Sequence, residues 1–133
     1  MRRLGLTLLA AATVALTGCG AKVVKVYRVD GTADCLRKGG YRVRTDARKL
    51  GLVAASASGG ALRAFEEGNT VTISFGASHT EAVNISNLYR RFAPKRLRPH
   101  IDDVMRVRKN AVLLWTITPP VEEENKVDDC LQG

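Results

Sequence analysis

An uncharged run near the start of the chain decides how much of it is available to fold. Arg2 and Arg3 are followed by an apolar stretch over residues 4–17, which ends at Gly18 and Cys19. A positive start, an apolar middle and small residues before a cleavage point are typical of a secretory signal peptide. A helix over the apolar stretch would extend roughly 21 Å, short of a hydrocarbon core of about 30 Å. We therefore expect export, rather than a transmembrane helix.

The end of this leader resembles the lipobox of bacterial lipoproteins. In Leu16-Thr17-Gly18-Cys19 an aliphatic residue and two small residues precede a cysteine. The resemblance covers the leader only, and it implies cleavage before Cys19 and a diacylglyceryl thioether on that residue. Two acyl chains anchor a protein stably, whereas one gives marginal, reversible binding. The expected location is the outer side of the cytoplasmic membrane or the outer membrane.

This interpretation divides the chain into a signal peptide (1–18), a lipidated tether (19–22) and a single domain (23–133). The chain has 21 basic residues; Arg2 and Arg3 lie in the leader, so 19 remain against 13 acidic residues. A positive excess favours an anionic neighbour, such as anionic lipid, a wall polymer or an envelope protein, although solubility explains it equally well. Aromatic residues are scarce and are not interleaved with basic ones, so no nucleic-acid partner is expected.

Two cysteines remain once Cys19 is assigned to lipid. Cys35 and Cys130 would lie in an oxidising compartment, where an even pair usually forms a disulfide. A bond across a loop of roughly a hundred residues contributes about 4–5 kcal/mol in the chain-entropy model. Two buried free thiols or a redox pair are the alternatives, and the chain contains no Cys-x-x-Cys motif to favour the redox pair.

Apolar periodicity predicts the α+β class. Strands do not alternate strictly with helices, so we expect a small antiparallel or mixed sheet with about three helices packed mainly on one face. The last predicted strand is apolar almost throughout, which places Trp115 in the core. The predicted strands cover 23–29, 41–45, 61–66, 70–75, 101–108 and 111–118, and the predicted helices cover 32–38, 78–92 and a segment that begins near Pro119.

Three segments carry local predictions that the structure can test. Ser78 and Glu81 match a capping box at the start of the 78–92 helix. Residues 46–60 are mostly small or polar, which predicts a long flexible surface loop. In the C-terminal helix, Val121 and Val127 are expected on the buried stripe.

A cluster of basic residues is the strongest signal that core packing does not explain. Near an anionic surface each such charge contributes about 1 kcal/mol to binding, although a solvated helix end would have the same composition. The predicted basic surface consists of Arg90, Arg91, Lys95, Arg96, Arg98, Arg106 and Arg108.

The favoured hypothesis is a non-catalytic binding or interaction module with this basic surface. The alternative is a small envelope hydrolase or metal-dependent enzyme that uses His100 with Asp102 or Asp103. Zinc normally needs three or four ligands, and the sequence shows no second ligand cluster, so we assign no catalytic residue, metal ligand or cofactor. A small-ligand carrier would need an apolar cavity, which a core of this size does not favour.

Overall fold

The protein is described here from a computed structural model, which describes residues 18, 20 and 24–133. The predicted signal peptide (1–18) and the predicted lipidation site, Cys19, lie outside the described residues, apart from Gly18, which is exposed. Within the described part of the chain, no helix has both the length and the apolar character needed to cross a membrane.

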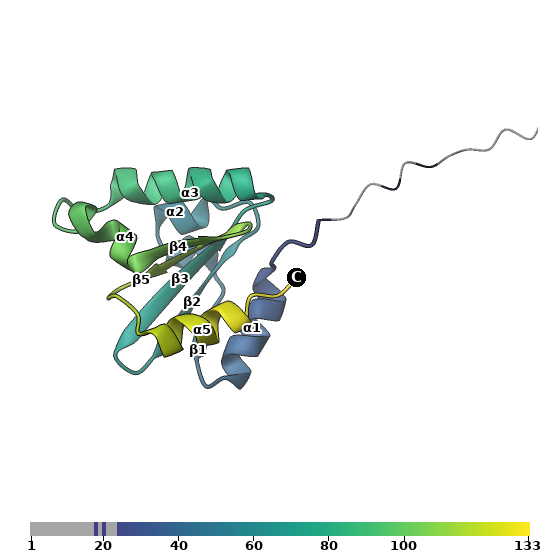
Figure 1. Cartoon of the computed structure of the whole chain (residues 1–133), viewed down its shortest axis with the longest axis horizontal. Helices are drawn as coiled ribbons and strands as arrows, with labels where there is room; N and C mark the ends of the chain where they lie inside the picture. Colours follow the sequence, from purple (N-terminus) through teal and green to yellow (C-terminus); the bar gives the residue numbers. More distant parts are fainter. Residues whose placement is uncertain (1–17, 19, 21–23) are drawn as a thin grey trace, which may run out of the picture.

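A five-stranded sheet with antiparallel neighbours organises the domain (Figure 1). The spatial order of the strands is β1-β2-β3-β5-β4. The strands are β1 (Arg42–Arg44), β2 (Ala61–Glu66), β3 (Asn69–Phe75), β4 (Met105–Arg108) and β5 (Ala111–Trp115). The helices are α1 (Val29–Lys38), α2 (Leu52–Ala55), α3 (His79–Phe92), α4 (Ile101–Val104) and α5 (Val121–Asp129).

The predicted α+β class and antiparallel sheet are therefore confirmed, with more helices than expected. These helices also cover both faces of the sheet rather than mainly one. Alternate residues of β3 and β5, among them Ile73, Leu113 and Trp115, pack with α1 and α5. The opposite face of β5, at Val112, packs with α2 and α3. The apolar sequence of β5 suits burial on both faces of an internal strand.

The two elements with the clearest sequence patterns are also confirmed. β2 and β3 form the predicted hairpin, with Ala61 opposite Ser74 and Glu66 opposite Asn69. At the start of α3, Ser78 Oγ accepts from the Glu81 backbone N–H, as a capping box requires. The Glu81 carboxylate differs from the motif, because it accepts from the Ala77 and Ser58 backbone N–H groups instead of that of Ser78.

The strand predicted over residues 23–29 is wrong for its described part. Residues 24–28 have no regular secondary structure, and α1 begins at Val29. The backbone of Tyr27 bonds to the Asn110 side chain, and the Arg28 N–H donates to the Gln132 carbonyl. The β-branched residues of this segment therefore face no neighbouring strand, and their backbone groups find other partners.

The flexible loop predicted over residues 46–60 is also wrong. A 3-10 turn at Ala47–Lys49 leads into α2, where Val53 and Ala54 are buried. Small residues suggested flexibility, but alanine has the highest helix propensity, and its small side chain lets α2 pack closely. The strand predicted over 101–108 is likewise helical in its first half, as α4, and Val121 is 70% exposed instead of buried.

Candidate functional site

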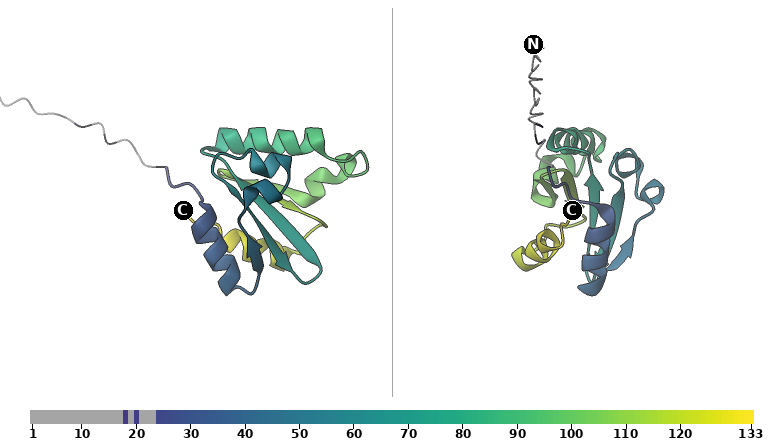
Figure 2. Two further views of the ribbon diagram at one scale, coloured as in Figure 1. Left: turned by 180° about the vertical axis from the view of Figure 1, so that it is seen from behind. Right: turned by 90° about the vertical axis from the view of Figure 1, so that its right-hand side faces the viewer.

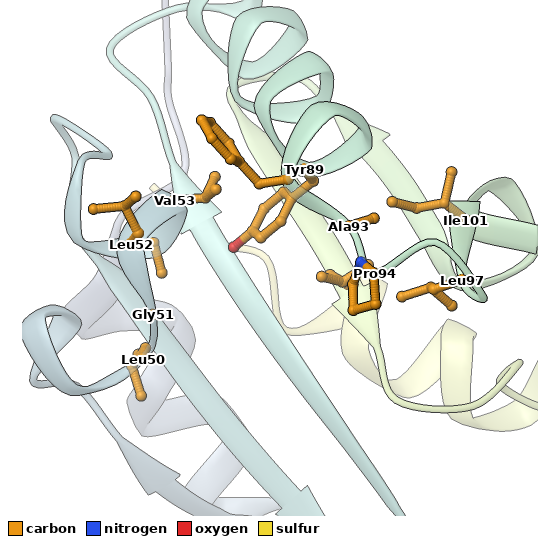
Figure 3. A pocket seen from close by; sticks show the side chains of 12 residues that line it. Leu50, Gly51, Leu52, Val53, Tyr89, Ala93, Pro94, Leu97 and Ile101 are labelled. Carbon is orange, nitrogen blue, oxygen red and sulfur yellow. The ribbon is translucent and has the colours of Figure 1, made fainter.

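An apolar cavity of about 270 Å³ lies between α2 and the end of α3. One wall comes from Leu50 to Ala54, and the other from Tyr89 to Leu97 (Figure 3). Pro94, which cannot continue α3, is one of the residues that line the cavity. This cavity lies at the surface and not within the core, so the expectation that the core has no apolar cavity to spare stays a prediction.

Large apolar side chains on both walls are open to water. Leu52 is 76% exposed on α2, and Phe92 is 57% exposed on the last turn of α3. The polar atom of the Tyr89 side chain is already satisfied, because its hydroxyl is 2.8 Å from Ser74 Oγ. Burial raises the pKa of Tyr89, which keeps the hydroxyl neutral. The cavity is thus suited to an uncharged, apolar group.

A second cavity, of about 370 Å³, adjoins the first at Leu50 and has a basic lining. Arg44, Lys49 and Arg63 line it, together with Asp46, whose carboxylate is 3.8 Å from Lys49 Nζ. The Arg63 guanidinium donates to the Leu50 carbonyl and so fixes the wall between the two cavities. We call the first space the apolar cavity and the second the cationic cavity.

Part of the predicted basic surface borders the apolar cavity on the side away from the cationic cavity. We call this part, which consists of Arg91, Lys95, Arg96 and Arg98, the basic rim. Arg91, Lys95 and Arg96 are exposed beside the lining residues Phe92 and Pro94. Within residues 24–133, no carboxylate lies within ion-pair distance of these three side chains. The Arg91 guanidinium lies 5.8 Å from the centre of the Phe92 ring, in a cation–π contact.

Arg98 is exposed but has an additional structural role at the end of α3. Its guanidinium donates to the backbone carbonyls of Ala93 and Arg91. A cation near the last carbonyls of a helix also interacts favourably with the helix dipole. Arg98 therefore holds the wall of the apolar cavity while it adds a charge to the rim.

The other predicted basic residues are bound to carboxylates. Arg90 pairs with Asp102 at 2.9 Å. Arg106 and Arg108 both reach Glu124 on α5, at 2.9 and 2.8 Å, and they lie on the face of the sheet opposite the apolar cavity. The predicted basic residues thus form one surface only from Arg91 to Arg98. Arg106 and Arg108 instead hold α5 against the sheet.

The basic rim lies at the opposite end of α3 from the N-terminal tether. Val24 and Lys25 border the start of α3 at Ser78 and His79. With 14 residues, α3 extends about 21 Å from that point to Phe92. Figure 1 and the left view of Figure 2 show the described residues before α1 beside that helix, away from α4.

The groups named for the enzyme hypothesis meet only on the surface. His100 Nδ1 is 3.5 Å from Asp103, and their side chains are 71% and 62% exposed. Asp102 points to Arg90 instead. None of His100, Asp102 and Asp103 lines the apolar cavity or the cationic cavity, and no cluster of three metal-binding side chains occurs among the described residues. This geometry excludes no water and places no base against a nucleophile.

Sequence reasoning missed Leu52, Lys49 and Arg63 as members of one site. The signal that could have found them is Leu52 close after the basic 47–49 segment. The small residues that follow made the whole 46–60 region read as a loop, so the helix that presents Leu52 was not predicted. Comparisons of the chain with protein-family models, with curated proteins and with solved structures find no match.

Proposed function

We propose that this chain is an exported lipoprotein, anchored through a diacylglyceryl thioether on Cys19, whose domain is a non-catalytic module that binds an anionic partner in the cell envelope. The observation that carries the binding proposal is the apolar cavity with cationic groups on two sides. Arg91, Lys95 and Arg96 lie on one side, and Arg44 and Lys49 on the other.

The cysteines support the anchor. The chain has three cysteines, and Cys35 and Cys130 are joined, with Cα atoms 5.3 Å apart. Stable disulfides form in oxidising compartments, which agrees with export. Cys19 is the remaining thiol, at the position that the lipobox resemblance assigns to lipid.

The distance between the basic rim and residues 24–25, which follow the predicted tether, favours a partner other than the anchoring bilayer. The basic rim is about 21 Å along α3 from the helix end that borders Val24 and Lys25. Screening reduces the attraction of exposed charges beyond a Debye length of about 8 Å at physiological salt. A wall polymer or an acidic surface above the membrane is therefore better placed to meet Lys95 and Arg96.

Charge reversal on the rim tests this proposal. The mature chain with Cys19→Ser should bind polyglutamate, and the paired change Lys95→Glu with Arg96→Glu should abolish most of that binding. A matched control reverses two adjacent basic residues at another helix end, Arg37→Glu with Lys38→Glu, and should have little effect. Affinity should also fall as salt rises. Equal losses from both pairs, or binding that salt does not alter, would refute the proposed basic surface.

A further inference from the structure

The two cavities together have the shape and charge of a site for an amphiphile. Leu50 lines both, so a ligand long enough to cover this residue would reach from the apolar cavity to the side chains of Arg44, Lys49 and Arg63. The two spaces differ sharply in chemistry, because one is lined by aliphatic and aromatic side chains and the other by three cations and one carboxylate.

We propose that the apolar cavity and the cationic cavity together form a groove that binds an amphiphile with one acyl chain and an anionic headgroup. The acyl chain would lie in the apolar cavity, and the headgroup would lie against Arg44, Lys49 and Arg63. This inference rests on the proposed function for the supply of such a ligand at a membrane. It adds the chemical class of the partner, which the basic rim alone does not define.

Charge complementarity identifies the headgroup as an anion. Lys49 has a single carboxylate near it, Asp46, which also accepts from Arg48 Nε at 3.2 Å. Arg44 lies 5.5 Å from the Phe65 ring, which orients its guanidinium without neutralising it. A carboxylate or phosphate in the cationic cavity would therefore meet a net positive field, with the planar guanidinium groups offering paired donors.

The size of the apolar cavity favours one chain. A volume of about 270 Å³ is just below the range of about 300–1,000 Å³ that is usual for ligand sites. A single flexible chain in the space between α2 and the end of α3 would cover the exposed faces of Leu52 and Phe92, which line it. A rigid or two-chain ligand would have to open the wall that Arg63 holds at the Leu50 carbonyl.

Calorimetric titration of the mature Cys19→Ser chain tests the inference. This chain includes residues 24–133, which contain the described core and the disulfide. The probes are dodecanoate, lauroyl lysophosphatidylglycerol and lauroyl lysophosphatidylcholine, each below its critical micelle concentration. Inorganic phosphate is the fourth probe. We expect saturable binding of one or both anionic amphiphiles, which separates a free fatty acid from a lysophospholipid, and weaker binding of the zwitterion.

Substitutions in each cavity should act on different probes. Leu52→Ser should weaken every amphiphile about fivefold through lost apolar contact, whereas Val121→Ser, at an equally exposed valine on α5, should have no effect. Lys49→Gln or Arg44→Gln should weaken only the anionic amphiphiles, by about fivefold for each charge. Lys38→Gln is the matched control on α1.

Four results would overturn the inference: no saturable binding of either anionic amphiphile, equal affinity for the zwitterion, binding of inorganic phosphate as strong as that of the amphiphiles, or equal effects of Leu52→Ser and Val121→Ser. Binding of an acidic amphipathic peptide in place of all amphiphiles would assign the groove to a protein partner. Failure here with intact, rim-dependent polyglutamate binding would reject the amphiphile and leave the proposed function standing.

Discussion

At the scale of single residues, Asn110 joins three parts of the chain that are distant in sequence. Its buried side chain accepts from the Tyr27 N–H and donates to the carbonyls of Tyr27 and Gly76. These bonds take the place of the strand pairing that the 24–28 segment lacks. The side-chain amide therefore fixes Tyr27 against the domain.

Asn110→Ala should lower the free energy of unfolding by about 2 kcal/mol, because it leaves backbone groups buried without partners. Urea denaturation followed by circular dichroism measures the change. Asn125→Ala, at an exposed position of α5, serves as the control and should stay within about 0.5 kcal/mol of wild type. A loss no larger than that of the control would show that Asn110 does not fix the segment.

Glu81 gives stability a defined pH dependence. Its pKa is lowered by the Ser58 hydroxyl, which donates to the carboxylate at 2.7 Å, and by the Ala77 N–H. Because the folded-state pKa lies below the unfolded value of about 4.3, the stabilisation is complete above that value and is lost as pH falls through the folded-state pKa.

Glu81→Gln should therefore cost about 1 kcal/mol at pH 7 and progressively less as the pH drops below about 4. Thermal unfolding of both proteins from pH 7 to pH 3 follows this convergence. Glu67→Gln, in the exposed hairpin turn, is the reference substitution. A constant difference between wild type and Glu81→Gln across the range would contradict the assignment.

At the scale of elements, sequence patterns predicted those whose signals are complete in the local chain. The β2–β3 hairpin has alternating apolar residues around Gly68, and α3 has both its Ser78 cap and its terminating Pro94. The patterns failed where a short element depends on distant partners. In α4, the buried residues Ile101 and Val104 are three positions apart, as on one face of a helix, but the segment was read as part of the strand that begins at Met105, because a short apolar segment does not distinguish a helix from a strand.

The docking of α5 on the sheet depends on a carboxylate that two arginines share. Glu124 is 18% exposed and accepts from Arg106 Nε and Arg108 Nη2. Glu124→Ala should destabilise the fold by about 1–3 kcal/mol, because it leaves the partly buried Arg106 guanidinium without a carboxylate and Arg108 with Asp128 alone. Denaturant midpoints measure the loss, with Glu122→Ala on the exposed face of the same helix for comparison. Equal effects would show that the ion pairs do not hold α5.

At the scale of the whole molecule, the candidate site combines predicted and unpredicted parts. Arg91, Lys95 and Arg96 were expected on a basic surface from composition alone. Their relation to Lys49 and Arg63 was not predictable, because it arises from the packing of α2 beside α3 and from the pairing of Arg44 with Arg63 across β1 and β2. Sequence proximity cannot show which charges will find carboxylates, as Arg106 and Arg108 do.

The disulfide joins the two ends of the domain, from α1 to the residue that follows α5. The paired change Cys35→Ser and Cys130→Ser should cost about 2–5 kcal/mol, since it releases a long loop in the unfolded chain. Unfolding of the variant and of wild type, each with and without reductant, measures this cost. Reductant should affect wild type alone, and an unchanged wild-type transition would contradict the bond.

Mass spectrometry of protein extracted from the envelope, digested without reductant, tests the lipoprotein assignment most directly. The proposed function predicts that the N-terminal peptide begins at Cys19 and has the added mass of a diacylglyceryl group. It also predicts that the peptides containing Cys35 and Cys130 are recovered as one linked species. An N-terminal peptide that retains residues 1–18, or a Cys19 without lipid, would contradict the assignment.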